Sequence, residues 1–352
     1  MRLILLFVFL LILVSCGRKE SGFVPRTFKK VEIEALLQDS LLNVRAIEVD
    51  MNYALSFAAS NGIIGGNYFQ NEEVIGIRDT IRNDSVFMNF RSLASPSNNY
   101  GFLLSIGSPA QLYKVSIDSI YLVYKEEHEK AFYDSMDFWN DQEGIAIGDP
   151  TEDCMSIIIT RDGGNTWSKL SCDNLPKTKA GEAAFAASDT NIAIVGDHTW
   201  VATGGNVSRV LYSPDKGNTW EVYDTPIIQG TETTGMYSID FYDALNGFAI
   251  GGDYTKPEDN SSNKIRTKDG GKTWEVVGVN QEPGYRSCVQ YIPNREGKEL
   301  VVVGFNGIDY SNDAGSTWKH LSNEGFYSIR FLNDSVAYAA GKGRISKLTF
   351  KE

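Results

Sequence analysis

The stretch Thr160-Arg161-Asp162-Gly163-Gly164-Asn165-Thr166-Trp167 decides how this chain folds, because three more versions of it follow. They are Ser213-Pro214-Asp215-Lys216-Gly217-Asn218-Thr219-Trp220, Thr267-Lys268-Asp269-Gly270-Gly271-Lys272-Thr273-Trp274 and Ser311-Asn312-Asp313-Ala314-Gly315-Ser316-Thr317-Trp318. In the shared pattern, [Ser/Thr]-x-Asp-x-Gly-x-Thr-Trp, the Ser/Thr and Asp side chains can satisfy turn amides. The glycine tolerates a positive φ, and the tryptophan returns the chain to a core. We call these stretches the repeat turns and predict that each joins two antiparallel strands.

A second repeated signal precedes each repeat turn, namely an apolar alternating run, a short polar turn and a small or β-branched run. The clearest examples are 136–138 with 144–149, 184–185 with 192–197 and 239–241 with 247–253. Weaker ones are 288–291 with 300–304 and 329–331 with 336–341, and two upstream are 47–49 with 58–66 and 88–90 with 101–107. These units predict an all-β fold, a seven-bladed β-propeller with four-stranded blades, over a single domain at 27–352.

The last of these units has enough chain for three strands but not for four. An alternating stretch at 27–37 can supply the missing strand. We therefore predict that the N-terminal strand pairs with the last unit and closes the ring, which removes open sheet edges.

The N-terminus has the features of an export signal. Met1-Arg2 is a short basic start, 3–14 is an apolar run too short for a stable span, and Leu13-Val14-Ser15-Cys16 follows. That ending resembles the bacterial lipobox, which implies that Cys16 is lipidated and becomes the first residue after cleavage of 1–16. The polar residues 17–26 are expected to be a tether. The alternative is an ordinary secretory signal with an incidental cysteine.

From about Thr27 to the C-terminus, the paired hairpin and repeat turn resemble the Asp-box, or BNR, repeats of bacterial β-propellers of the photosystem II stability/assembly factor type. The first two units depart from the pattern, since Ser116-Ile117-Asp118-Ser119 is at best a relic of the turn. The resemblance implies a binding or assembly scaffold, although no residue implies a photosynthetic partner. It also implies a structural role for the repeat-turn residues Asp162, Trp167, Asp215, Trp220, Asp269, Trp274, Asp313 and Trp318, because in glycosidases this turn lies opposite the active site.

A candidate binding face follows from the expected ends of the second strands. Asp149, Asp197 and Asp253 sit at equivalent places in three adjacent units, and the connections after them carry Trp200 and Tyr254. Aromatic and polar residues together suit a saccharide or a peptide. The alternative is that Gly-Asp simply makes a turn in each unit.

An enzyme on the same scaffold is the competing hypothesis. A sialidase-like, glycan-processing hydrolase needs an arginine cluster, a Tyr nucleophile paired with Glu, and an acidic group. Arg45, Arg91, Arg286 and Arg330 lie on candidate inner strands and could converge. A non-catalytic scaffold remains the preferred interpretation, and no catalytic residue is assigned.

The cysteines and histidines give no cofactor or metal site. The three histidines are scattered and no Cys-x-x-Cys is present, so we expect no metal and no cofactor. Cys154 and Cys172 are symmetric about the first repeat turn, which predicts a disulfide between neighbouring strands, with two free thiols as the alternative. Cys288, on an inner strand, is expected to be a buried apolar residue.

Composition sets the class of partner. The chain has 352 residues and a net charge of −12, and its basic clusters are limited to Arg18-Lys19 and Lys29-Lys30. Nucleic acid is therefore not an expected partner. We expect a lipoprotein of the bacterial cell envelope, at the outer membrane facing the periplasm, that binds a protein or glycan partner and contacts the membrane through its lipid anchor.

Overall fold

The computed structural model describes residues 23–49, 54–70, 73–83, 86–97, 99–116 and 118–352. The predicted signal peptide, Cys16 and residues 17–22 of the predicted tether lie outside this part of the chain, so these predictions stay predictions. Among the described residues, no helix is long and apolar enough to cross a membrane.

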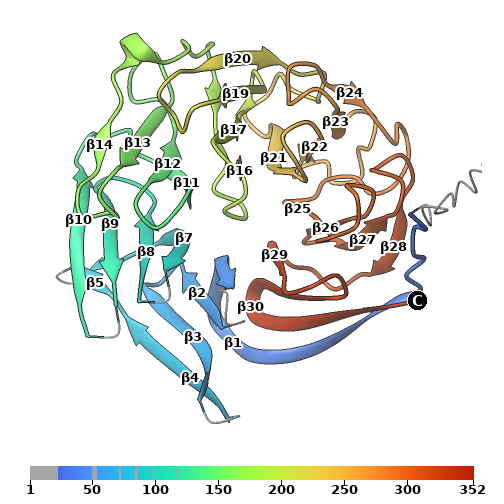
Figure 1. Ribbon diagram of the computed structural model, residues 1–352, viewed down its shortest axis with the longest axis horizontal. Helices are drawn as coiled ribbons and strands as arrows, with labels where there is room; N and C mark the ends of the chain where they lie inside the picture. Colours follow the sequence, from blue (N-terminus) through green and yellow to red (C-terminus); the bar gives the residue numbers. More distant parts are fainter. Residues whose placement is uncertain (1–22, 50–53, 71–72, 84–85, 98, 117) are drawn as a thin grey trace, which may run out of the picture.

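Antiparallel sheets surround a central axis in a ring (Figure 1). Four of them have four strands each. The first has β7 (Phe90–Ser97), β8 (Tyr100–Ser105), β9 (Ala110–Val115) and β10 (Ile120–Glu126), and the second has β11 (Tyr133–Phe138), β12 (Gly144–Gly148), β13 (Ser156–Thr160) and β14 (Ser168–Lys169). The third has β16 (Ile192–Val195), β17 (His198–Ala202), β19 (Arg209–Ser213) and β20 (Glu221–Asp224), and the fourth has β25 (Cys288–Tyr291), β26 (Leu300–Gly304), β27 (Gly307–Ser311) and β28 (Lys319–Ser322).

Two sheets have six strands each. One has β21 (Thr234–Phe241), β22 (Gly247–Asp253), β23 (Lys264–Thr267) and β24 (Glu275–Val276), extended by β15 (Glu182–Ala183) and β18 (Gly204–Gly205). The other has β29 (Ser328–Phe331), β30 (Val336–Lys351), β1 (Lys30–Val49), β2 (Leu55–Ala59), β3 (Ile63–Gln70) and β4 (Glu73–Thr80). A short pair, β5 (Arg82–Asn83) and β6 (Val86–Phe87), and the 3-10 turn η1 (Cys172–Asn174) complete the elements.

The prediction of seven separate four-stranded blades is wrong, because the described residues form six blades. The first and last predicted units belong to one continuous sheet. The first half of β1 pairs with β30 from Lys30↔Lys351 to Gln38↔Arg344, and its second half pairs with β2. β30 bends back on itself, since the Phe350 N–H donates to the Ser335 carbonyl. The predicted pairing of the N-terminal strand with the last unit is present, and the same long strand joins the two units.

The blades hold together through apolar side chains buried on both faces of each sheet. In β13 the run Ile157, Ile158 and Ile159 is buried throughout. Ile157 and Ile159 pack in a cluster with Val201 of the next blade, whereas Ile158 packs with Phe102 of the previous one. A strand covered on both faces needs such a continuous apolar run, and this explains the β-branched runs in the sequence.

The ring has two faces. In the four blades that carry a repeat turn, the turn between the first and second strands lies beside the turn between the third and fourth. Hydrogen bonds join the two, as from Lys216 N to Asp197 O at 2.9 Å and from Gly270 N to Leu245 O at 3.0 Å. We call this side the repeat-turn face, and the side with the remaining connections the opposite face.

Candidate functional site

Each repeat turn is closed by its own side chains. The Asp215 carboxylate accepts hydrogen bonds from Thr219 N at 2.8 Å and Thr219 Oγ1 at 2.7 Å, and Ser213 Oγ accepts from Gly217 N at 2.7 Å. The same bonds recur around Asp162, Asp269 and Asp313. Partial burial tends to raise the pKa of Asp215, but the bonds from Thr219 and Ser213 outweigh it and hold that pKa below its usual value. These carboxylates are occupied within the turn.

The candidate binding residues do not share one face. Asp149 follows the second strand β12 and Asp253 is the last residue of the second strand β22, both on the opposite face, where Tyr254 is 49% exposed. Asp197 lies on the repeat-turn face, in the turn between β16 and β17. Trp200 is not a loop residue, since it is fully buried on β17.

The fourth predicted unit along the chain, 184–185 with 192–197, begins one strand too early. Ala184 and Phe185 belong to the connection that precedes the blade, and Ile192–Val195 is its first strand, not its second. Trp200 therefore stacks on Phe241 of the next blade with ring centroids 3.7 Å apart, and its Nε1 donates to Gly270 O at 2.8 Å. The grouping of Asp197 and Trp200 with Asp149 and Asp253 was wrong for this reason.

The two carboxylates on the opposite face accept hydrogen bonds from connections on that face. Asp149 Oδ1 accepts from Ala184 N at 2.8 Å, and burial raises the pKa of Asp149 to about 6. Asp253 is buried and its Oδ1 accepts from the N–H and hydroxyl of Thr255. The turn-making alternative thus accounts for Asp253, whereas Asp149 binds the connection that leads to the next blade. Tyr254 remains as an exposed aromatic side chain.

A connection between two sheets reaches into the centre of the ring (Figure 1). It comprises residues Phe185–Thr190, between β15 and β16, and we call it the central segment (Figure 1). Its main-chain carbonyls are held by arginines from three other strands. Arg91 donates to Ala186 O at 2.8 Å, Arg45 to Ala187 O at 2.9 Å and Arg330 to Asp189 O at 3.1 Å.

The side chains of the central segment reach the other blades. The Asp189 carboxylate accepts from Leu93 N at 2.9 Å and Met136 N at 3.3 Å. Ser188 Oγ donates to Ser287 O at 2.6 Å, and Thr190 Oγ1 donates to Ser238 Oγ at 2.7 Å. Through these bonds the segment contacts all the other blades. Short sequence patterns do not predict these contacts, because the partners are distant along the chain.

Two arginines lie side by side next to this segment. The Arg45 guanidinium lies 4.0 Å from the centre of the Tyr327 ring, and its buried Nε has no hydrogen-bond partner. Burial and the neighbouring Arg45 lower the pKa of Arg91 to about 10. Nearby, both carboxylate oxygens of the buried Asp134 lack hydrogen-bond partners. Burial, and secondly Asp149, raises the pKa of Asp134 well above its usual value, although Arg91 acts in the other direction.

Aromatic side chains continue from the arginine pair across the opposite face. Phe185 stacks on Tyr237 at 3.9 Å, Tyr237 meets Tyr285 at 4.8 Å, and Tyr285 stacks on Phe305 at 5.3 Å between ring centroids. Tyr254 lies 6.4 Å from both Tyr237 and Tyr285. We call these five residues the aromatic patch. Tyr254 and Phe305 are exposed, which leaves an apolar surface beside two cations.

Three of the four arginines of the hydrolase hypothesis, Arg45, Arg91 and Arg330, converge on the central segment, where they bind its main-chain carbonyls. Arg330 also pairs with Glu48 at 3.1 Å, and Arg286 pairs with the buried Asp309 at 2.6 Å. A Tyr–Glu pair exists, with Tyr133 Oη 2.7 Å from Glu126 Oε2, but Glu126 lies on the outer strand β10. An open depression of 540 Å³ on the opposite face lies elsewhere, between residues 38–40 and 342–344.

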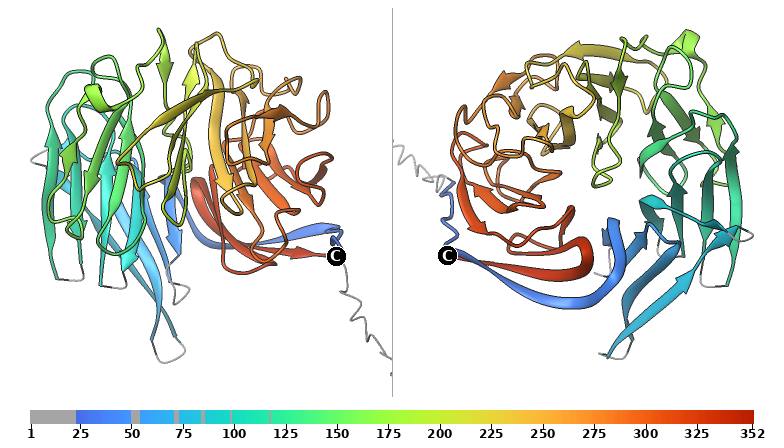
Figure 2. Two further views of the ribbon diagram at one scale, coloured as in Figure 1. Left: turned by 45° about the horizontal axis from the view of Figure 1, so that its top comes forward. Right: turned by 180° about the vertical axis from the view of Figure 1, so that it is seen from behind.

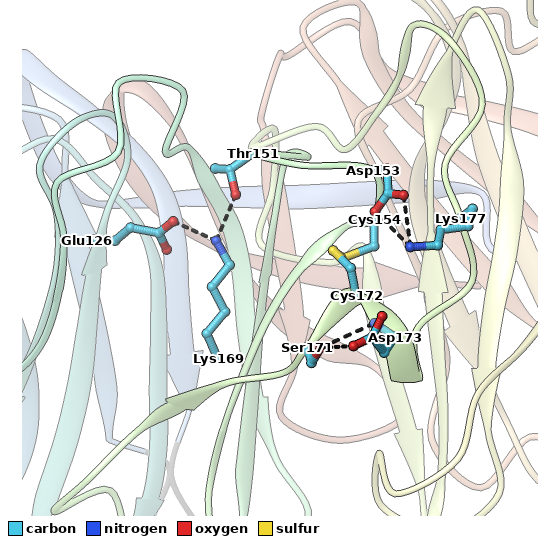
Figure 3. The surroundings of a disulfide bond; sticks show 9 residues. All are labelled: Glu126, Thr151, Asp153, Cys154, Lys169, Ser171, Cys172, Asp173 and Lys177. Atoms are coloured by element: carbon cyan, nitrogen blue, oxygen red, sulfur yellow. Dashed lines mark hydrogen bonds and ion pairs between the residues drawn. A yellow bond between two sulfur atoms is a disulfide. The ribbon is translucent and has the colours of Figure 1, made fainter.

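A disulfide joins Cys154 and Cys172, whose Cα atoms are 5.5 Å apart (Figure 3). The two residues lie just beyond the paired ends of β13 and β14 rather than on the strands. Asp153 also lies close to the two sulfur atoms, but these are bonded to each other and so are not free metal ligands. The bond holds the start of the long connection that leads to the central segment. Cys288 is a free, buried thiol.

Comparisons with known proteins agree with this architecture. No family model matches the chain, and no curated protein matches it. Among solved structures, it is similar to YCF48 bound to a D1 peptide, with a TM-score of 0.64 and 13% identity over 94% of this chain and 98% of that one. YCF48 from Cyanidioschyzon merolae has a TM-score of 0.61 and 11% identity over 92% and 98% of the two chains. The RRP9 WD40 repeats have a TM-score of 0.62 and 11% identity over 94% and 100%. The fold is that of a β-propeller, and at these identities the similarity shows the fold alone.

Proposed function

We propose that this chain is a non-catalytic, exported lipoprotein that binds a protein segment on the opposite face of its propeller. The observation that carries the proposal is the arginine pair Arg45 and Arg91 beside the aromatic patch. Two partly buried cations and exposed rings suit a segment with an acidic group and an apolar side chain. The structural neighbour solved with a D1 peptide supports a peptide as ligand, and its fold is shared here.

The envelope location rests on the sequence. Leu13-Val14-Ser15-Cys16 supports export and acylation of Cys16, which would hold the ring at the outer membrane, facing the periplasm. BNR-type repeats are supported by the four repeat turns and their common hydrogen bonds. The hydrolase alternative has little support, because the arginines that converge bind main-chain carbonyls of the central segment and Glu126 of the Tyr–Glu pair lies on an outer strand.

The test is a cross-linked pull-down from the bacterial envelope, read by mass spectrometry. A double variant, Tyr254→Ser with Phe305→Ser, removes the exposed rings of the aromatic patch. The matched control is Leu245→Ser, because Leu245 is 57% exposed on the repeat-turn face. We expect a protein partner that is lost in the double variant and retained in the control. If neither protein captures a partner and the protein binds on a glycan array, the ligand is a glycan and not a protein.

A further inference from the structure

The chain enters the ring through a docked N-terminal segment. Arg26 donates to Glu299 Oε2 from Nε at 3.0 Å and from NH2 at 2.7 Å, and its own N–H donates to Glu299 Oε1 at 3.0 Å. Its NH1 also pairs with Asp334 at 3.1 Å. The Glu299 side chain is fully buried. A buried, multiply bonded carboxylate fixes its partner far better than an exposed ion pair does.

The main chain of the same segment is held as well. Arg26 O accepts from Asn312 Nδ2 at 2.7 Å and from Tyr310 Oη at 3.1 Å, and Phe28 O accepts from Lys319 Nζ at 2.9 Å. Phe28 is buried against Tyr310, with ring centroids 4.7 Å apart. Residues 26–28 are therefore part of the folded domain, so the end of the predicted tether, at Arg26, is docked on the ring.

These partners place the entry of the chain on one face. Glu299 precedes β26 and Asp334 precedes β30, so both lie in turns between the first and second strands of their hairpins. Asn312 belongs to the fourth repeat turn. The described chain therefore begins at the repeat-turn face, whereas the arginine pair and the aromatic patch lie on the opposite face. Figure 2 shows that its start lies beside the C-terminus at the rim of the ring.

The distance from Cys16 to the docked segment limits how the ring can turn. The residues from Cys16 to Phe23 span at most about 25 Å when fully extended. Inverting the ring would send this stretch along the outside of a blade. The five residues of β26 alone rise about 17 Å, before the loops at either end are added. A tether of this length brings the surface that holds Cys16 to the repeat-turn face, where the described chain begins, more readily than to the opposite face.

We infer that the repeat-turn face lies against the membrane surface and that the opposite face points away from it, open to a partner. This orientation rests on the proposed function, because it assumes a lipid at Cys16. The partner of the repeat-turn face is the lipid surface itself. The docking of Arg26 fixes the orientation, since it sets both the point of attachment and the free length of chain.

The test attaches the chain from Cys16 to Glu352 to vesicles in a defined way. The Cys16 thiol is coupled to maleimide-bearing phosphatidylethanolamine in phosphatidylcholine vesicles, because Cys154 and Cys172 are bonded and Cys288 is buried. A fluorophore replaces either Lys272, in a repeat turn, or Lys256, between β22 and β23 on the opposite face. Both residues are exposed and belong to the same blade. Energy transfer to a dye in the lipid headgroups reports their distance from the membrane.

We expect stronger transfer from position 272 than from position 256. Equal transfer, or stronger transfer from position 256, would overturn the orientation. In Arg26→Ala the docked residues are released and lengthen the tether. The difference in energy transfer between positions 272 and 256 should then become smaller, while the protein still folds and still couples to the vesicles through Cys16. An unchanged difference in this variant would overturn the role given to Arg26. Incorporation of labelled palmitate in bacteria tests the proposed lipidation separately, because the vesicle result does not depend on it.

Discussion

Arg266, on the third strand of one blade, donates from its guanidinium to the main-chain carbonyl of Ala314 in the repeat turn of the next blade, at 2.9 Å. The equivalent carbonyl of each other repeat turn is bound in the same way. Lys114 donates to Gly163 O, Arg161 to Lys216 O and Trp200 to Gly270 O. At the first turn, a Cβ on Gly164 would lie 2.1 Å from the Phe102 ring of the preceding blade. The repeat turns therefore join neighbouring blades, and their sequence pattern is explained by packing and hydrogen bonding.

Asp215→Ala should destabilise the protein without affecting partner binding. It removes the acceptor of the Thr219 N–H and hydroxyl, and a lost buried or charge-assisted hydrogen bond costs about 1–3 kcal/mol. Asp197→Ala, on the same face, is the control. The Asp197 carboxylate is exposed and 3.6 Å from Lys216, so its loss should cost under about 0.5 kcal/mol. Urea unfolding measures both, and equal costs would contradict the structural role of the repeat turn.

The two aromatic residues once grouped on the binding face should behave in opposite ways. Trp200→Ala empties a fully buried site against Phe241 and should cost about 3–5 kcal/mol in the free energy of unfolding. Tyr254→Ala removes an exposed ring and should cost less than about 1 kcal/mol while weakening partner capture. Unfolding curves and the envelope pull-down separate the two effects. If the Trp200→Ala protein is as stable as the wild type but fails to capture the partner, Trp200 is a binding residue and not a core residue.

Loss of the disulfide should loosen the central segment. Cys154→Ser with Cys172→Ser opens a loop with a sequence separation of 18 residues. For loops of this size the expected loss is about 3 kcal/mol. Hydrogen exchange should also become faster in residues 185–190, because the connection that carries them loses its anchor.

Lys177→Ala is the control for the disulfide, since the Lys177–Asp153 ion pair restrains the same connection at 2.8 Å (Figure 3). Both partners are largely exposed, so this variant should lose less than about 1 kcal/mol. If exchange in residues 185–190 is the same in both proteins, the bonds to Arg45, Arg91 and Arg330 hold the segment without help from the disulfide.

The sequence could locate those elements whose signals are local. The four repeat turns, the hairpins β11–β12 and β21–β22, and the pairing of the N-terminal strand with β30 all follow from short patterns or from the length of the last unit. The blade count was wrong because a sequence pattern marks strands but not whether two units share a sheet through a bent strand such as β1.

The site was harder to predict because its contacts are long-range. Ala184-Phe185 resembles a strand, but the chain there turns into the ring centre, where arginines from distant strands bind its carbonyls. The burial of Trp200 depends on Gly270 and Phe241, and neither is close to it in sequence. Only Tyr254 among the predicted binding residues is exposed at the aromatic patch.

The buried carboxyl of Asp149 should make stability depend on pH in a direction opposite to that of the repeat-turn aspartates. Its folded pKa of about 6 lies above the usual value for Asp, so the folded state binds the proton more tightly than the unfolded state. That contribution to stability is fully present below about pH 4 and is lost as the pH rises through 6. Asp149→Asn cannot titrate and keeps an oxygen for Ala184 N. The stability of the wild type relative to this variant should therefore fall by about 2 kcal/mol between pH 4 and pH 8.

Asp215→Asn provides the comparison for this pH dependence. Partial burial slightly opposes ionisation of Asp215, but bonds from Thr219 and Ser213 outweigh it and hold its folded pKa below the usual value. Its contribution to stability is present above the unfolded pKa and is lost as the pH falls through the folded pKa. Urea midpoints of both variants and the wild type across this range give the result. If the Asp149→Asn difference is constant from pH 4 to pH 8, Asp149 is not the buried, proton-retaining group that its contacts indicate.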